Sequence, residues 1–275
     1  MRKINLLVSI TAISTMAFLY LPLVAVAFFS VNNTKYGLAW KGFTLDWYIK
    51  LFQNELILHA AWNTLVLAVV STLVSTLLGT ILAIGMDRFP WPRRMNTILD
   101  LTLHLPVIIP DIIFAAAMVV AFGFLRSLAS VFEPGLLNMI IAHITFQTAF
   151  VALVVRSRLV SIGKEIEEAA RDLYANTTYL LLKVTLPLLM PGIVAGAMLA
   201  FTLSLDDFVI SFFTAGPDSV TLPLYIYASV RRVVTPQIHA LSTIVLLVTI
   251  LLVICMERFT RRVNKKTNIR ETSIN

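Results

Sequence analysis

Six long runs of apolar residues recur along the chain and constrain its fold more than any other feature. A helix of about 20 apolar residues crosses a bilayer core about 30 Å thick, and each run is long enough. With 58% apolar and only 13% charged residues, the composition is that of a protein that folds in lipid. We predict an all-α integral membrane protein with six transmembrane helices, near residues 6–29, 61–86, 100–125, 136–155, 188–214 and 239–256.

The first run also resembles a secretory signal, because Arg2 and Lys3 precede it and residues 25–27 read Ala-Val-Ala. The apolar core of a signal peptide spans about 7 to 15 residues. This run continues from Leu6 past Ala27 into two phenylalanines. We therefore expect it to be retained as a membrane helix.

The 22 lysine and arginine residues outnumber the acidic residues, so the net charge is +7. The basic residues lie at the ends of the apolar runs rather than on one face. If the N-terminus is inside, most of them fall in cytoplasmic segments, at residues 2–3, 88–94, 156–183 and 258–270. The positive-inside rule then places both termini in the cytoplasm. Nucleic acid is not an expected partner.

Composition divides the chain into three parts: 1–58, with the first helix and a polar external loop; 59–256, the core; and 257–275, a basic tail that we expect to be solvated. In the external segment 215–238, prolines separate short pieces, and the stretch SVTLPLYIYASV is predicted to form a short surface helix. One cysteine, Cys255, cannot build a disulfide framework or a metal cluster. No metal site is predicted.

A charged amphipathic segment lies between the fourth and fifth apolar runs. Its apolar positions recur at helical spacing: Ile166, Ala169, Ala170 and Leu173. So narrow a stripe, built largely of alanine, suits docking into a groove on a partner better than burial under its own chain. The alternative is an ordinary loop helix with a Glu167–Arg171 pair, which contributes only about 0.2–0.5 kcal/mol.

Three acidic residues lie in the apolar runs without a basic residue at comparable depth: Asp111, Asp206 and Asp207. A carboxylate at the bilayer centre costs about 2.5–3.5 kcal/mol, so we expect these residues to mark a water-filled path for a cationic substrate. Asp206 and Asp207 are about 100° apart on a helix, and we expect one to line the path while the other pairs elsewhere. Asp111 follows Pro110, and its alternative role is to cap a helix restarted after the proline.

Aromatic rings also hold ammonium groups, at about 0.5–2 kcal/mol each. Trp47 is therefore a candidate for the external side of the path, although tryptophan more often anchors a helix at the membrane surface. His104 and His143 lie in apolar runs. Proton transfer is possible for them, but packed or hydrogen-bonded histidines are the commoner case.

The segment EAARDLYANTTYLLLKVTLP, residues 168–187, resembles the coupling motif of ABC-importer permeases. That family has Glu-Ala-Ala, three residues, Gly, nine residues, an aliphatic residue, one residue and Leu-Pro. The matching positions here are Glu168, Ala169, Ala170, Val184, Leu186 and Pro187, with Tyr174 in place of the glycine. The stretches FTLSLDDFVISFF, HITFQTAFVALVVRSRL and WKGFTLDWY resemble more closely the second permease of bacterial spermidine and putrescine importers.

This resemblance implies the type I ABC importer permease fold in the bacterial inner membrane, with a cytoplasmic coupling helix at 165–187. It also implies a chain that catalyses nothing itself. It implies three partners: an ATPase dimer that binds ATP and Mg²⁺, a second homologous permease and an external polyamine-binding protein. The chain needs no cofactor of its own and has no Gly-x4-Gly-Lys-Ser/Thr loop. The implied residues for coupling to the ATPase are Glu168, Ala169, Ala170, Leu173, Tyr174, Leu186 and Pro187.

In the family, the glycine supplies a positive φ between two short coupling helices at little cost. A tyrosine there would cost about 1–2 kcal/mol. We therefore expect the turn to shift to Asn176, a residue type that tolerates the left-handed region better.

Two other functions would use the same acids. An intramembrane aspartyl enzyme would pair aspartates from two helices, but Asp111 and Asp206 lack the Gly-x-Gly-Asp context of such enzymes. A proton-coupled antiporter would have no need of a coupling motif. We predict a permease subunit of an ATP-driven importer for putrescine, spermidine or both.

Overall fold

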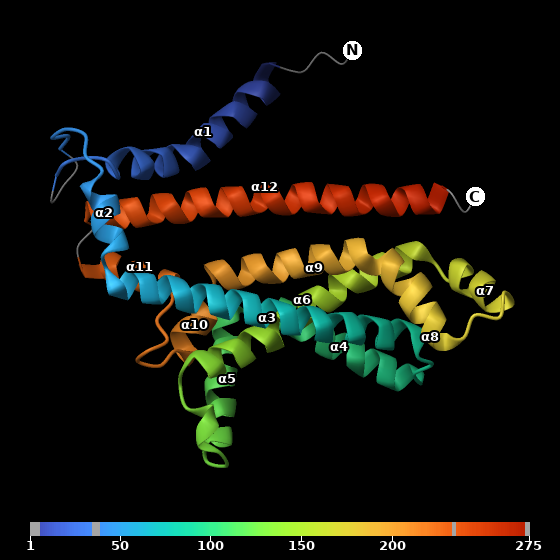
Figure 1. Ribbon diagram of the computed structural model, residues 1–275. Helices are drawn as coiled ribbons and strands as arrows, with labels where there is room; N and C mark the ends of the chain where they lie inside the picture. Colours follow the sequence, from blue (N-terminus) through green and yellow to red (C-terminus); the bar gives the residue numbers. More distant parts are fainter. Residues whose placement is uncertain (1–5, 35–38, 233–234, 273–275) are drawn as a thin grey trace. The chain divides into compact units, whose positions relative to one another are not determined.

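The computed structural model describes residues 6–34, 39–232 and 235–272 (Figure 1). Arg2 and Lys3, which entered the signal-peptide and orientation predictions, lie outside these residues. Every regular element within the described ranges is a helix, apart from an isolated bridge between Asn32 and Phe43. The chain forms two compact units, residues 1–59 with 225–253 and residues 60–224 with 254–275.

Within the described ranges, five helices are long and apolar enough to cross a membrane. They are α1 (Leu6–Phe29), α3 (Glu55–Arg88), α6 (Leu136–Ile162), α9 (Leu186–Asp206) and α12 (Pro236–Thr272). A sixth crossing is possible for the pair α4 (Arg93–Ile108) and α5 (Asp111–Arg126), which is bent by 111°. These helices confirm the predicted all-α membrane fold.

The third predicted span is therefore two helices rather than one. The backbone is extended at Ile109, where α4 ends, and Pro110 precedes α5. Proline has no N–H to donate and disfavours the helical conformation in the residue before it. This break places Asp111 at the first position of a new helix.

In the first unit, one asparagine organises the loop that follows α1. The Asn32 side chain donates to the Ala39 carbonyl at 3.0 Å and accepts from the Lys41 N–H at 2.9 Å. The loop leads into the short helix α2 (Asp46–Phe52). Tyr48 on this helix shares a 2.7 Å hydrogen bond with Ser30 at the end of α1, so the loop is closed by side chains of its own.

In the second unit, α6 is the central helix. Its buried residues pack with those of α3, α4 and α9 in one cluster, and with those of α5 and α10 (Val209–Thr214) in another. Two glycines allow close contact at Val151: a Cβ on Gly79 of α3 would lie 2.8 Å from the Val151 Cβ, and a Cβ on Gly196 of α9 would lie 3.2 Å from its Cγ1. Small residues of this kind let membrane helices approach closely.

Short elements connect the long helices. Between α6 and α9 the chain forms α7 (Glu165–Asp172), α8 (Thr177–Tyr179) and the π-helical segment η2 (Leu180–Thr185), and η1 (Ser130–Phe132) precedes α6. The predicted surface helix is confirmed as α11 (Leu222–Arg232), none of whose residues is buried. The basic tail continues α12 as far as Thr272. Within the second unit, α7 and α8 lie at one end of α9 and α10 lies at the other (Figure 1).

Candidate functional site

Helix α9 ends at the aspartate pair. Asp206 is its last residue, Asp207 has an extended backbone (φ −62°, ψ 124°), and α10 begins two residues later. The fifth predicted span therefore stops at Asp206 instead of continuing to residue 214. Because the helix breaks between the two carboxylates, their directions are not set by a regular 100° step.

The Asp207 carboxylate is hydrogen-bonded to other residues of the chain. Its carboxylate accepts hydrogen bonds from the Ile210 N–H at 3.2 Å and the Ser211 N–H at 2.8 Å. These bonds satisfy two of the free donors at the start of α10, which is the work of a capping residue. The same carboxylate lies 3.3 Å from His143 Nε2.

His143 connects this cap to three helices. The ring is 1% exposed, and its Nδ1 lies 2.9 Å from the Ser204 hydroxyl on α9. Its Nε2 also lies 3.3 Å from the Ser211 hydroxyl on α10, and Ser204 is in turn 3.2 Å from the Ser71 hydroxyl on α3. With the proton on Nε2 the ring donates to Asp207 and accepts from Ser204. His143 is thus an inter-helix hydrogen-bonded histidine.

Two of the three predicted path carboxylates are exposed in the chain. Asp206 is exposed at the end of α9, and Asp111 is exposed in the first turn of α5, where a negative charge is favourable. The helices that carry them meet at one apolar cluster, which includes Ala115 of α5, Leu203 of α9 and Ile210 of α10. The N-cap position of α5 is held by Pro110, which makes no side-chain cap hydrogen bond, and Asp111 is the first residue inside the helix.

Trp47, the fourth predicted path residue, lies on α2 in the first unit, whereas the three aspartates belong to the second. The indole N–H donates to the Asn32 carbonyl at 2.9 Å. Lys50 Nζ lies 4.7 Å from the centre of the Trp47 ring, so this ring already holds an ammonium group from its own chain. That contact is of the cation–π kind that the sequence suggested for a substrate.

The coupling segment forms the predicted amphipathic helix, α7, but its burial is unusual. The apolar stripe points outward: Ile166 is 40% exposed and Leu173 is 82% exposed, and Ala169 is also exposed. The single buried residue of this eight-residue helix is Glu167. An outward stripe is what docking on another protein requires.

Glu167 makes contacts that sequence analysis missed. Both carboxylate oxygens accept from Arg88 Nε, at 2.9 and 3.1 Å, and Oε1 also accepts from the Thr185 hydroxyl at 3.1 Å. Sequence analysis considered only a local pair with Arg171. The true partner is 79 positions away, and no short-range pattern points to it.

The turn after α7 is a correction. Tyr174 adopts the left-handed conformation, with φ of 61°, so the turn stays where the family has glycine and does not move to Asn176. The tyrosine is 97% exposed. Asn176 is needed elsewhere, because its side chain accepts from the Tyr179 N–H at 2.8 Å and caps α8.

The last two residues of the motif, Leu186 and Pro187, form the start of α9 directly after η2. Proline is tolerated in a first turn because its missing N–H costs least there. The π-helical segment contributes buried Leu180 and Thr185. After the turn at 173–176, the motif is therefore helical from Thr177 through η2 into α9.

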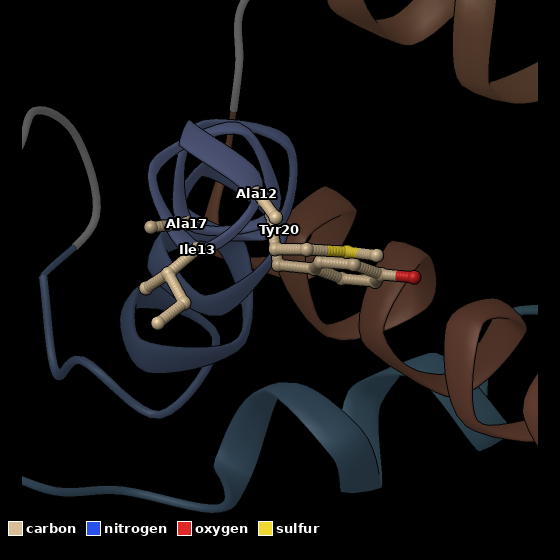
Figure 2. A pocket seen from close by; sticks show the side chains of 5 residues that line it. Ala12, Ile13, Ala17 and Tyr20 are labelled. Carbon is tan, nitrogen blue, oxygen red and sulfur yellow. The ribbon is translucent and has the colours of Figure 1, made fainter. Parts of the chain in front are cut away.

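The hollow shown in Figure 2 is not a comparable site. It is lined by Ala12, Ile13, Met16, Ala17 and Tyr20, all on α1. These residues carry no charge, and only the tyrosine has a polar side chain. Among the residues that the structure describes, no group of His, Cys, Asp and Glu could hold a metal ion.

Comparison with known proteins gives consistent matches. The family model described as "Binding-protein-dependent transport system inner membrane component" matches residues 75–269. Over 245 residues the chain is 37% identical to the spermidine/putrescine transport system permease protein PotC of Escherichia coli (strain K12), covering 89% of this chain and 90% of PotC. Over 230 residues it is 37% identical to the putrescine transport system permease protein PotI of the same strain, covering 83% and 82%.

A solved structure shows the same fold. A protein chain in a bacterial ABC transporter involved in the import of the acidic polysaccharide alginate superposes with a TM-score of 0.73 over 92% of both chains, at 20% identity. At that identity the likeness concerns the fold alone.

Proposed function

The chain belongs to the family of binding-protein-dependent transport system inner membrane components, and on this premise we propose that it moves polyamines, either putrescine, spermidine or both, into a bacterial cell. As such a permease it spans the inner membrane several times and has the type I importer fold. ATP and Mg²⁺ are bound by a partner ATPase, so this chain is not itself an enzyme.

The exposed Asp206 is the observation that carries the choice of a cationic substrate. Its neighbour Asp207 is held by His143 and by two backbone N–H groups, which leaves Asp206 as the member of the pair that can meet a ligand. Asp111 supplies a second exposed carboxylate on a helix that packs at the same apolar cluster. A polyamine carries two to four separated ammonium groups, which such carboxylates can meet in turn.

The names of the relatives support the same substrate class, since PotC and PotI are named for spermidine/putrescine and putrescine transport. In this proposal Trp47 contributes an aromatic face for an ammonium group at the external side, in exchange for Lys50. Asp207 supports the site by fixing the helix break beside Asp206.

For coupling, we propose that α7 and the turn at Tyr174 dock on the ATPase. The contact residues are Glu168, Ala169, Ala170, Leu173 and Tyr174, and Leu186 and Pro187 pass the movement to α9. The assembly contains an ATPase dimer, a second homologous permease and an external binding protein. The permease core spans residues 59–256, and both termini lie in the cytoplasm, as the distribution of basic residues favours.

In the proposed cycle, ATP binding closes the ATPase dimer, and α7 transmits the closure to the membrane helices. The path then opens outward and accepts polyamine from the binding protein. Hydrolysis resets the path inward. The outward apolar stripe of α7 supports this route, because it leaves the docking face free.

Uptake of labelled putrescine and spermidine tests the substrate proposal. Cells expressing the complete complex are compared for wild type, Asp206→Asn and Asp207→Asn at matched membrane levels. Loss of a charged hydrogen bond to an ammonium group predicts uptake about ten- to hundredfold lower for Asp206→Asn. Asp207→Asn should instead reduce the amount of assembled complex. Unchanged uptake per complex in Asp206→Asn contradicts the proposal, and uptake that survives ATP depletion would favour an antiporter.

A further inference from the structure

The coupling helix α7 is attached to the rest of its unit by a charge rather than by an apolar face. An amphipathic helix ordinarily buries its apolar stripe and exposes its charges. Here Leu173 is 82% exposed, while Glu167 is 6% exposed and is the one buried residue of α7. What holds α7 in place must therefore be sought at Glu167.

The Glu167 carboxylate has two partners from different helices. Arg88, the last residue of α3, donates from Nε to both oxygens at 2.9 and 3.1 Å. Thr185, the last residue of η2, donates its hydroxyl to Oε1 at 3.1 Å. One carboxylate thus connects the end of one membrane-spanning helix with the beginning of another.

Arg88 extends the network further. Its Nη2 donates to the Gly163 carbonyl, between α6 and α7, at 3.3 Å, and its Nη1 contacts Asp87. The Arg88 and Glu167 side chains are 16% and 7% exposed, which separates this pair from the solvated surface pairs that contribute little. Removing one partner of a buried pair leaves the other charge uncompensated.

We infer that Glu167 is a positioning residue that transmits the movement of α7 to α3 and α9 at once; the inference rests on the proposed function, in which α7 docks on the ATPase. Directional bonds from one carboxylate force the three segments to move together. The junction at Thr185 matters because it ends a π-helical segment, a form that occurs mainly as short interruptions at functional positions. The neighbouring Glu168 is exposed, and in the proposed function it contacts the ATPase.

The test uses the whole complex in proteoliposomes and measures ATP hydrolysed per polyamine taken up. Glu167→Gln keeps the size of the side chain and an oxygen for Thr185 but removes the charge that faces Arg88. We expect this ratio to rise by about two- to thirtyfold, with the ATPase still bound. Arg88→Gln should have the same effect. Glu165→Gln is the matched control, since Glu165 is exposed on the same helix, and it should leave the ratio unchanged.

Reversal of the pair separates positioning from folding. The double variant Arg88→Glu with Glu167→Arg should return the ratio toward the wild-type value, whereas each single reversal should raise it. An unchanged ratio in assembled Glu167→Gln overturns the inference, and so does a double variant no better than either single one. If wild type takes up no polyamine, the substrate proposal fails; stimulation of ATP hydrolysis by the binding protein then reports the coupling, and Glu167→Gln should still weaken that stimulation.

Discussion

Two adjacent pairs of acids, Glu167-Glu168 in α7 and Asp206-Asp207 at the end of α9, are divided in the same way at opposite ends of one unit. In each pair one acid is bonded inward and the other is exposed. The inward partners differ. Glu167 meets a charged arginine from a distant helix, whereas Asp207 meets backbone N–H groups three and four residues ahead, together with His143.

This difference teaches what each region requires. The cap at Asp207 is largely local, and it fixes where α10 begins whatever α9 does. The Glu167 bonds are long-range, so they constrain the relative position of whole helices. The proposed ligand site needs a helix break of fixed local shape, whereas the proposed coupling helix needs a firm connection to the elements that it moves.

The largest expected effect is on stability, in the region around Asp207 and His143. His143→Leu removes the ring that joins Asp207, Ser204 and Ser211 and leaves buried polar groups unpaired, which should lower the free energy of unfolding by about 3 kcal/mol. Thermal and denaturant unfolding of the purified complex measures this change. His104→Leu is the control, because His104 is half-buried and its Nδ1 contacts only the carbonyl of Asp100 on its own helix. Equal stability of the two variants would refute the assigned role of His143.

An intermediate effect is expected in the coupling region, on transport rather than stability. Glu168→Ala removes an exposed charge from the proposed docking face, and it should raise the ATP hydrolysed per polyamine by about two- to tenfold while unfolding stays unchanged. Glu165→Ala provides the comparison from the same helix. Normal transport by Glu168→Ala would show that the exposed member of this pair has no partner.

The smallest expected effect concerns the turn. Tyr174→Gly relieves a left-handed conformation that costs about 1–2 kcal/mol, and the greater chain entropy of glycine offsets about 0.5–1 kcal/mol of that gain. A net stabilisation of about 1 kcal/mol or less should appear in unfolding of the complex. Tyr174→Ala, which keeps the Cβ and loses the ring, should not be stabilised; if it is, the strain does not lie in the backbone.

The long helices could be predicted from the sequence because lipid imposes length and apolarity on each one. Two spans differ from the prediction because of single residues that the sequence already shows. Pro110 divides the third span because it lacks an N–H, and the fifth span ends at Asp206 where the Asp207 side chain caps the next helix. Helix breaks of this kind can be predicted from the local sequence.

Only part of the candidate site could be predicted from the sequence. The outward stripe of α7 and the division of labour between Asp206 and Asp207 were expected, but the identity of the occupied aspartate depends on where His143 projects from α6. No short-range pattern pointed to the role of Glu167, since its partner Arg88 is the last residue of a different helix, α3. Spacing along one helix cannot reveal a contact between helices. The prediction that the turn shifts to Asn176 was wrong, because a cost of about 1–2 kcal/mol did not displace the turn from Tyr174, and Asn176 caps α8 instead.

Gly79 of α3 and Gly196 of α9 both approach Val151 of α6 closely. The contact at Gly196 is a point about which α9 can tilt. Gly196 lies near the middle of the helix, with Thr185 and Asp206 each roughly 15 Å away along the axis. If Val151 acts as the fulcrum, a displacement at the clamped end would tilt the helix and swing Asp206 the opposite way by a similar amount. Distances from labels at both ends of α9 to α6 would then change with opposite signs, and equal signs would exclude a pivot. A displacement at the Thr185 end would then move the Asp206 end in the opposite direction by about the same distance.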